Sequence, residues 1–147
     1  MSFPRYIARG LPAVAALLAT AAPVLAKPED PPKPKPPELE LLTRSQEAAL
    51  RQKRIKFAVR SEDGRRVRVV AELVVEGIPE DFHFQLEPQR KRLRHDEARV
   101  SMELSRRQRE VLAFGEQACM RADVNAQAKV GSRVRTIHEP LRKSAGC

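Results

Sequence analysis

IKFAVRSEDGRRVRVVAELVV, residues 55–75, is the stretch that decides the fold of this chain. On both sides of segment 61–64, apolar residues alternate with charged or small ones. The two alternating sets are Ile55, Phe57 and Val59, then Val67, Val69, Ala71, Leu73 and Val75. A period of two predicts half-buried strands, and Asp63-Gly64 is a dipeptide typical of hairpin turns. The stretch therefore predicts two consecutive strands, each with one face in a core.

Shorter alternating segments continue toward the C-terminus. A second turn is predicted at 77–81, and further strands are predicted at 82–86, 100–104, 118–124 and 132–137. Short helices are predicted at 43–54 and 105–114. Each begins with the pattern L-[ST]-R-x-Q-x-x-x-L, with a capping hydroxyl near its start, and Gly115 is expected to end the second. Six or seven short strands with regular turns predict an all-β, antiparallel sandwich with one or two short helical crossovers.

The N-terminus carries an export pattern. Arg5 and Arg9 precede an apolar run over 11–26 that ends in Val-Leu-Ala. A charged start, a short apolar run and small residues at its exit predict a cleavable signal peptide at 1–26. The alternative is a membrane anchor, which the shortness of the run and its two prolines disfavour. We expect the mature protein to be secreted, extracellular or periplasmic, without a transmembrane span after cleavage and in association with the cell wall.

Composition divides the remaining chain into three parts. Segment 28–37 holds six prolines, so 27–38 is predicted to be an extended Pro-rich tether. The alternatives for it are a spacer, a ligand for a proline-binding module or an unstructured N-terminal segment. Residues 39–140 are predicted to form the β-sandwich domain, and 141–147 a C-terminal tail.

Two cysteines, Cys119 and Cys147, are available for pairing. In an oxidising compartment they are candidates for one disulfide that ties the tail to the domain. Two free thiols, or a bond to another chain, are the alternatives. The sequence has no closely spaced Cys and His residues, so a zinc site is not predicted.

Positive charge is the main hint of a partner. The net charge of +9 falls to +7 when Arg5 and Arg9 leave with the signal. The densest cluster is 89–95, and its Arg90, Lys91, Arg92 and Arg94 are the candidate anion-binding residues. The expected partners are anionic wall polymers, lipid head groups or an acidic protein. Specific nucleic-acid binding is not expected, because the mature chain lacks Tyr and Trp for base stacking. The other interpretation of the cluster is a solvated turn.

Catalytic patterns are not found in the sequence. There is no G-x-S-x-G elbow and no glycine-rich phosphate loop, and His83, His95 and His138 lie in polar strands and turns. The strand carboxylates alternate with apolar residues, as a solvated sheet face requires. These carboxylates are Glu72, Glu76, Glu87 and Glu103. We expect no enzyme activity, cofactor or metal.

Three segments resemble the immunoglobulin-like β-sandwich domains of secreted bacterial, actinobacterial-type, surface proteins. They are LVVEGIP at 73–79, FQLEP at 84–88 and the leucine–turn–strand segment at 93–104. The resemblance implies an immunoglobulin-like fold and an extracellular setting, and it supplies no catalytic residues. The expected function is a non-enzymatic structural or adhesive module of the cell envelope. The alternative is an electrostatic binding protein, or accessory subunit, for an anionic partner.

Overall fold

This computed structural model describes residues 30–62 and 64–147. The predicted signal peptide lies outside the described residues. Contacts separate 1–33 from a compact unit over 34–147, which contains every helix and strand of the described chain. No helix among the described residues is long and apolar enough to cross a bilayer. The elements are β1 (Glu38–Leu41), α1 (Gln46–Gln52), β2 (Arg54–Arg60), β3 (Arg66–Val75), β4 (Phe82–Gln85), β5 (Gln89–Arg92), β6 (Glu97–Glu103), α2 (Arg106–Gln117), β7 (Ala122–Val130) and β8 (Arg133–Leu141).

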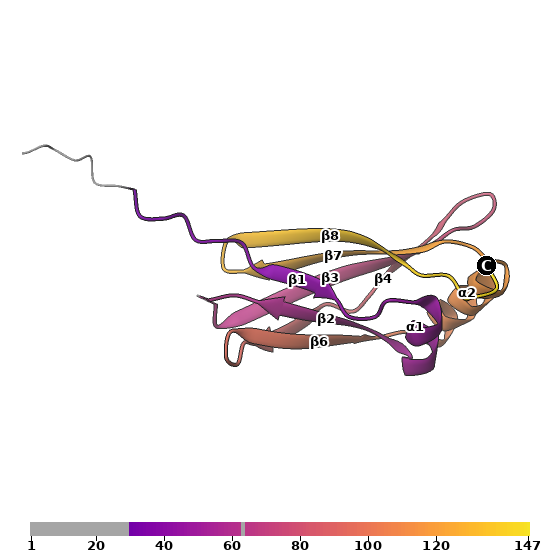
Figure 1. Cartoon of the computed structure of the whole chain (residues 1–147), viewed down its shortest axis with the longest axis horizontal. Coiled ribbons are helices and arrows are strands. Elements are labelled where there is room, and N and C mark those ends of the chain that lie inside the picture. The colour runs from indigo at the N-terminus through magenta and orange to yellow at the C-terminus, as the bar shows by residue number, and fades with distance from the viewer. Residues whose placement is uncertain (1–29, 63) are drawn as a thin grey trace, which may run out of the picture. The chain divides into compact units, whose positions relative to one another are not determined.

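Two antiparallel sheets form the compact unit (Figure 1). One has the order β1-β2-β6. The other has the order β4-β3-β7-β8, and β5 joins it by pairing with β3 on the same edge as β4. The predicted all-β, antiparallel sandwich with short helices is therefore the observed fold.

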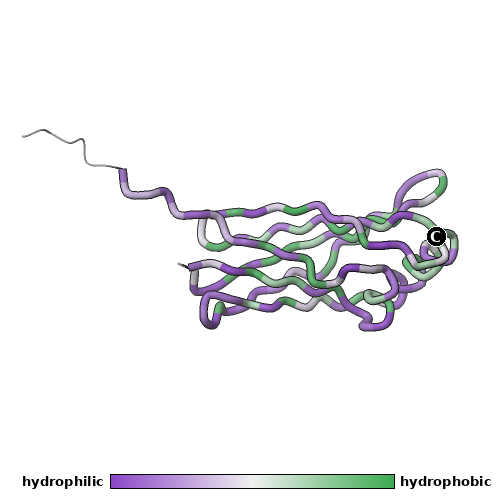
Figure 2. The backbone as a smooth tube through the Cα atoms, viewed as in Figure 1, coloured by the Kyte–Doolittle hydropathy of each residue, from purple (hydrophilic) through white to green (hydrophobic). Residues whose placement is uncertain are grey.

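The core lies between the sheets and follows the predicted alternation. Phe57, Leu73, Val69 and Val124 are among the fully buried side chains, and they come from both sheets. The alternation is visible along the strands as exchanging apolar and polar segments in Figure 2. One face of each long strand therefore supplies the hydrophobic free energy of the fold, and the opposite face is free to carry charge.

The predicted hairpin at Asp63-Gly64 is wrong. β2 pairs with β1 and β6, whereas β3 pairs with β4, β5 and β7. The chain passes from one sheet to the other between β2 and β3, and the N–H of Ser61 donates to the carbonyl of Asp96. Asp-Gly favours a reversal of the chain, but whether the two strands pair is decided by contacts with distant strands.

The basic cluster at 89–95, for which a solvated turn was the alternative interpretation, begins in a broken edge strand. β4 stops at Gln85, β5 resumes at Gln89, and both pair with β3. Pro88 lies in the break, and it has no N–H to donate to a sheet. The polar segment QRKR is thus a strand without an apolar face, a pattern that period-two alternation does not detect.

Of the two predicted capping hydroxyls of the first helix, Thr43 and Ser45, Ser45 is the cap, and the second helix starts after Ser105, where its predicted range begins. The hydroxyl of Ser45 accepts from the N–H of Ala48, and Ser105 forms a capping box with Gln108. Gly115 was predicted to end the second helix, but it lies inside α2. A Cβ at this position would lie 2.9 Å from Val75 Cγ1, so glycine allows the helix to approach β3 closely.

The strand predicted from residue 118 begins only at Ala122, because α2 runs to Gln117 and a loop follows. Cys119 lies in this loop with a φ of 55°, and a disulfide joins it to Cys147. The bridge holds the C-terminal tail beside the end of α2, where Figure 1 places the C-terminus.

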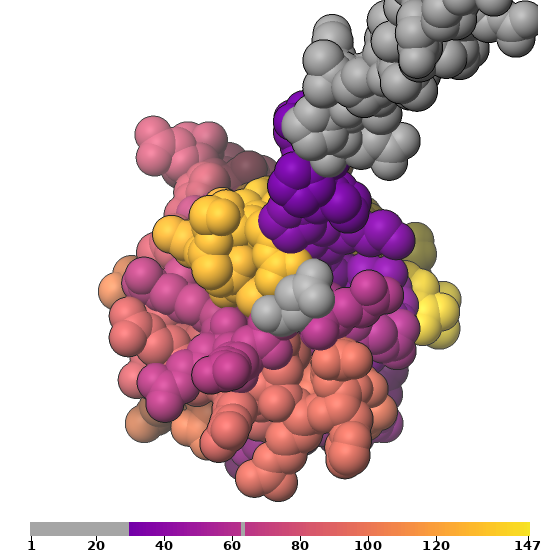
Figure 3. All heavy atoms as spheres, turned by 90° about the vertical axis from the view of Figure 1, so that its left-hand side faces the viewer, coloured from indigo at the N-terminus to yellow at the C-terminus, as the bar shows by residue number. Residues whose placement is uncertain are grey.

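The last residues of the Pro-rich segment lie against β8. Arg133 Nη1 donates to the carbonyl of Lys35 at 3.1 Å, and Arg135 Nε donates to the carbonyl of Pro37 at 3.2 Å. Pro37 is buried. Figure 3 shows this indigo segment beside the yellow β8. The chain therefore enters the compact unit along the edge strand of the larger sheet.

Candidate functional site

A basic face occupies the outer surface of the larger sheet at the start of β3. We define it by five exposed cations: Arg66, Arg68, Arg90, Arg92 and Lys129. Register places Arg90 opposite Arg68, and Arg68 opposite Lys129, in one row across β5, β3 and β7. Arg92 lies opposite Arg66 in the next row. Like charges therefore face each other directly in three cross-strand pairs.

The spacing of these charges follows from sheet geometry. Neighbouring strands lie about 5 Å apart, and side chains on one face repeat every ~7 Å along a strand. A shallow groove of about 600 Å³ runs over this surface, lined by the five cations together with Val67, Lys91 and Gly131. The result is a two-dimensional array of positive charge rather than a single anion pocket.

No described carboxylate lies within ion-pair distance of the basic face. Elsewhere in the described chain, cations do have partners, such as Arg44 with Glu40 and Arg106 with Glu110. Like charges directly opposite each other destabilise a sheet. This face therefore carries an unfavourable electrostatic energy that a bound anion would reverse.

The four predicted anion-binding residues do not act as one group. Arg90 and Arg92 lie on the basic face. Lys91 has the opposite phase in the strand, lines one side of the groove and donates its ammonium to the carbonyl of Arg99. Arg94 follows the strand and its backbone bonds with Glu97, outside the groove lining.

Sequence reasoning missed Arg66, Arg68 and Lys129. Arg66 and Arg68 occupy the polar phase of the predicted β3 strand, so their outward direction was available from alternation. Their position opposite Arg92 and Arg90 was not, because the pairing of β5 with β3 is a long-range contact.

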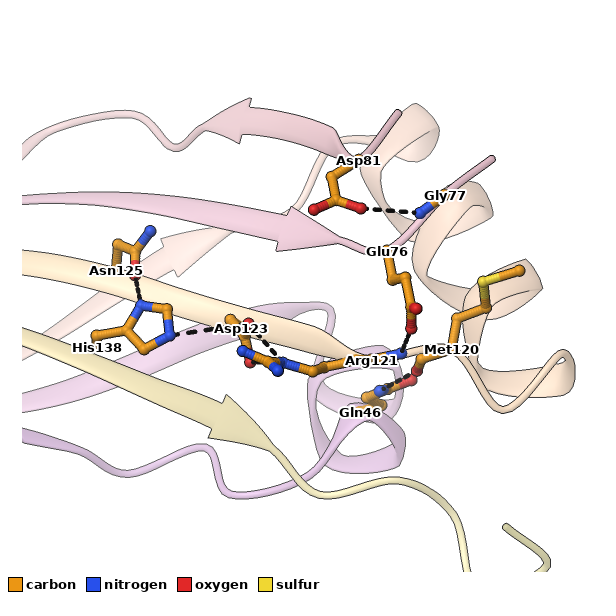
Figure 4. A network of polar contacts seen from close by, with 9 residues as sticks. All are labelled: Gln46, Glu76, Gly77, Asp81, Met120, Arg121, Asp123, Asn125 and His138. Atoms are coloured by element: carbon orange, nitrogen blue, oxygen red, sulfur yellow. Dashed lines mark hydrogen bonds and ion pairs between the residues drawn. The ribbon is translucent and has the colours of Figure 1, made fainter. Parts of the chain in front are cut away.

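A polar network covers the other half of the same sheet face (Figure 4). Arg121 Nε lies 2.8 Å from Asp123 Oδ2, and the backbone N–H of Arg121 donates to Glu76 Oε2 at 2.9 Å. His138 Nε2 lies 3.8 Å from Asp123 and its Nδ1 contacts Asn125. The hydrogen bond and the charge of Asp123 raise the pKa of Arg121 above its ordinary value, so this guanidinium remains charged at all physiological pH values.

The remaining candidate catalytic groups lie apart. His83 pairs with Glu72 at 3.0 Å, His95 lies in the turn before β6, and Cys119 is held in the disulfide. The described residues contain no group of three or more His, Cys, Asp or Glu arranged to hold a metal ion. Among the described residues, the side-chain partners of His83 and His138 are Glu72, Asn125 and Asp123.

Comparison of the chain with models of known protein families and with curated proteins finds no match. The basic face sets like charges opposite each other in three cross-strand pairs. The charge of the basic face and the register of its strands, rather than similarity to known proteins, are therefore the basis for proposing a function.

Proposed function

We propose that this protein is a non-enzymatic module of the cell envelope that adheres to an anionic polymer through the basic face. The main evidence is that like charges lie directly opposite each other across β5, β3 and β7, with no described carboxylate within ion-pair distance. Cross-strand charge pairs are worth roughly 0.2–1 kcal/mol each, so three repulsive pairs cost the isolated fold a measurable part of its stability. A polyanion that follows the rows replaces this repulsion with attraction.

A polymer suits the array better than a small anion. The groove is open and its cations lie in two rows, so a flexible chain of phosphates or carboxylates contacts several of them at once. Such binding gains from multiple contacts and weakens steeply with salt. The anionic polymers of bacterial walls supply this chemistry.

The extracellular, immunoglobulin-like setting is part of the proposal. The disulfide between Cys119 and Cys147 supports an oxidising compartment. The N-terminal pattern at 1–26 supports export. When β4 and β5 are taken as one broken strand, the sheet orders support an immunoglobulin-like arrangement, in which the third, sixth and seventh strands share one sheet.

The test compares two double variants of equal charge change. Arg68→Gln with Arg90→Gln removes two of the three cations in one row of the basic face, and Arg51→Gln with Arg107→Gln removes two exposed cations from the helices. Binding of the mature chain to long-chain polyphosphate is measured by fluorescence anisotropy over a series of salt concentrations. We expect the first variant to lose at least about tenfold in affinity, with a shallower salt dependence, and the control to lose about twofold or less.

A second readout separates binding from folding. Since Arg68→Gln with Arg90→Gln removes two of the three repulsive pairs, Arg68 with Arg90 and Arg68 with Lys129, we expect it to raise the free energy of unfolding by up to about 2 kcal/mol while binding falls. Equal losses of affinity in the two variants would reduce the interaction to net charge and contradict the proposal. Stronger binding to poly-glutamate than to polyphosphate would favour the alternative, an accessory subunit for an acidic protein.

A further inference from the structure

An apolar groove lies at the opposite end of β3 from the basic face. It has a volume of about 450 Å³, and its two walls are the β3–β4 turn and α2. Ile78 is 87% exposed and Phe82 42% exposed on the first wall, and Phe114 is 68% exposed on the second. Val111 and Met120 complete its apolar lining. These are three of the four large hydrophobic side chains that are exposed in the described chain.

Two glycines allow the walls of the groove to form. A Cβ on Gly77 would lie 2.4 Å from the carbonyl oxygen of Glu80 and 2.8 Å from Phe82 Cε2, so the turn closes only around glycine. Gly115 lets α2 approach Val75 at the floor. The walls are thus fixed by backbone packing, and the groove does not depend on the rotamer of one side chain.

Carboxylates surround this groove, in contrast to the basic character of the chain as a whole. Glu76 and Glu110 line it from opposite walls, and Glu80 and Asp81 lie in the same turn as Ile78. Glu110 has Arg106 as its partner, and Arg121 lies near Glu76 and Asp81. Glu80 has no described cation within ion-pair distance, so the four carboxylates outnumber the two cations. The charge of the rim therefore selects a cationic segment with an apolar side chain.

The edge of the sheet beside the groove is also unpaired. β4 is the last strand on its side of the sheet, and no described strand pairs with its outer edge. Phe82 and Phe84 stack with ring centroids 6.3 Å apart, and they lie opposite Val75 and Leu73, on the core-facing side of the sheet. A strand added to β4 would place its own inward side chains next to these rings, at the mouth of the groove.

We propose that this groove and the β4 edge together bind an extended segment of a partner protein that alternates Lys or Arg with bulky apolar residues. Backbone hydrogen bonds to β4 align the segment, one apolar side chain enters between Ile78 and Phe114, and the flanking cations meet Glu76 and Glu110. This site is separate from the basic face and does not depend on the function proposed for that face.

The test uses short synthetic peptides as probes and the isotope-labelled mature protein. A Lys–Leu alternating peptide is compared with Glu–Leu and Lys–Ser versions by amide chemical-shift titration. We expect saturable binding of the Lys–Leu peptide with shifts centred on β4 and on 110–115 of α2. Phe114→Ser should weaken it at least about tenfold, and Val134→Ser, at another exposed apolar position, should not. Since Phe114 is largely exposed, its replacement should leave the fold intact, and the circular dichroism spectrum checks this.

Several results would overturn the proposal. Equal binding of the Lys–Leu and Lys–Ser peptides would show that charge alone acts, and equal binding of the Glu–Leu peptide would remove the role of the rim. If analytical ultracentrifugation detects a dimer of the wild-type chain that the Phe114→Ser variant does not form, the groove is occupied by a second copy of the chain. If the protein binds phosphatidylcholine vesicles through the same residues, the partner of the groove is a lipid surface.

Discussion

Removing the disulfide should destabilise the protein by less than the size of its ring suggests. Cys119 and Cys147 are separated by 28 residues, and the loop-entropy relation gives about 3.6 kcal/mol for closing such a ring in the unfolded chain. In the folded chain, Arg142 is still held, because its N–H donates to Arg44 and its carbonyl accepts from Gln46.

Only the short segment 142–147 must therefore close onto Cys119 in the folded state. The ring in the unfolded chain is about five times longer than this segment, and the difference in closure free energy is about 1.4 kcal/mol. Among the described residues, the tail beyond Arg142 makes no other bond to the rest of the chain: Cys147 Sγ lies 3.8 Å from the carbonyl oxygen of Glu116, but it carries no hydrogen in the disulfide. We therefore expect the tail to fray without the bridge, while β8 stays in the sheet.

The assay is urea unfolding of the double variant Cys119→Ser, Cys147→Ser, followed by far-ultraviolet circular dichroism. A loss of about 1.4 kcal/mol corresponds to a midpoint lower by ~1 M urea at an m-value typical of a small domain. The wild-type chain under reducing conditions is the control and should match the variant. A loss near 3.6 kcal/mol would show that the tail is held without the bridge, and no loss would show that the bridge does not form.

Three further substitutions test α2 and the polar network at the start of β7. Gly115→Leu should destabilise the fold by about 2–3 kcal/mol, since its side chain must displace Val75, and an unchanged urea midpoint would refute the close approach of α2 to β3. Ser105→Ala should cost about 1 kcal/mol through loss of the capping box, and a thermal melt indistinguishable from wild type would contradict it. Arg121→Gln tests the ion pair of Arg121 with Asp123, the contact that raises the pKa of Arg121. A raised pKa adds stability that is complete below the unfolded value and is lost only as pH rises through the folded one. Both values exceed those of other side chains, so the stability difference from wild type should stay constant between about pH 7.5 and pH 9. A difference that changes across this window would contradict the assignment.

Alternation was sufficient to predict the inner faces of the long strands. The period of two depends only on the backbone, so Ile55, Phe57, Leu73 and Val75 are buried as expected. The helix starts were predictable for a similar reason, because a capping hydroxyl acts on N–H groups within the next turn. These are local effects, and local sequence carries them.

Strand partners were not predictable in the same way. The Asp63-Gly64 turn gave no information on which sheet would receive β3, and QRKR lacks the apolar face that marks a strand. The candidate site has the same limits. Its two arginines in β5 were visible as a charge cluster, whereas Arg66, Arg68 and Lys129 join them only through the pairing of three strands that are distant in sequence.

The break at Pro88 accounts for both proposed surfaces. Before the break, β4 places Phe82 at the end of the sheet, where its ring remains partly exposed beside α2. After the break, β5 sets Arg90 and Arg92 against the arginines of β3. The two surfaces lie at opposite ends of β3, which is about 30 Å long. Their charges are opposite, so a polyanion is repelled by the acidic rim and a cationic segment is repelled by the basic face. Each proposed ligand is thereby directed to one end of the sheet, and the two proposals together predict that a polymer and a protein partner bind at the same time.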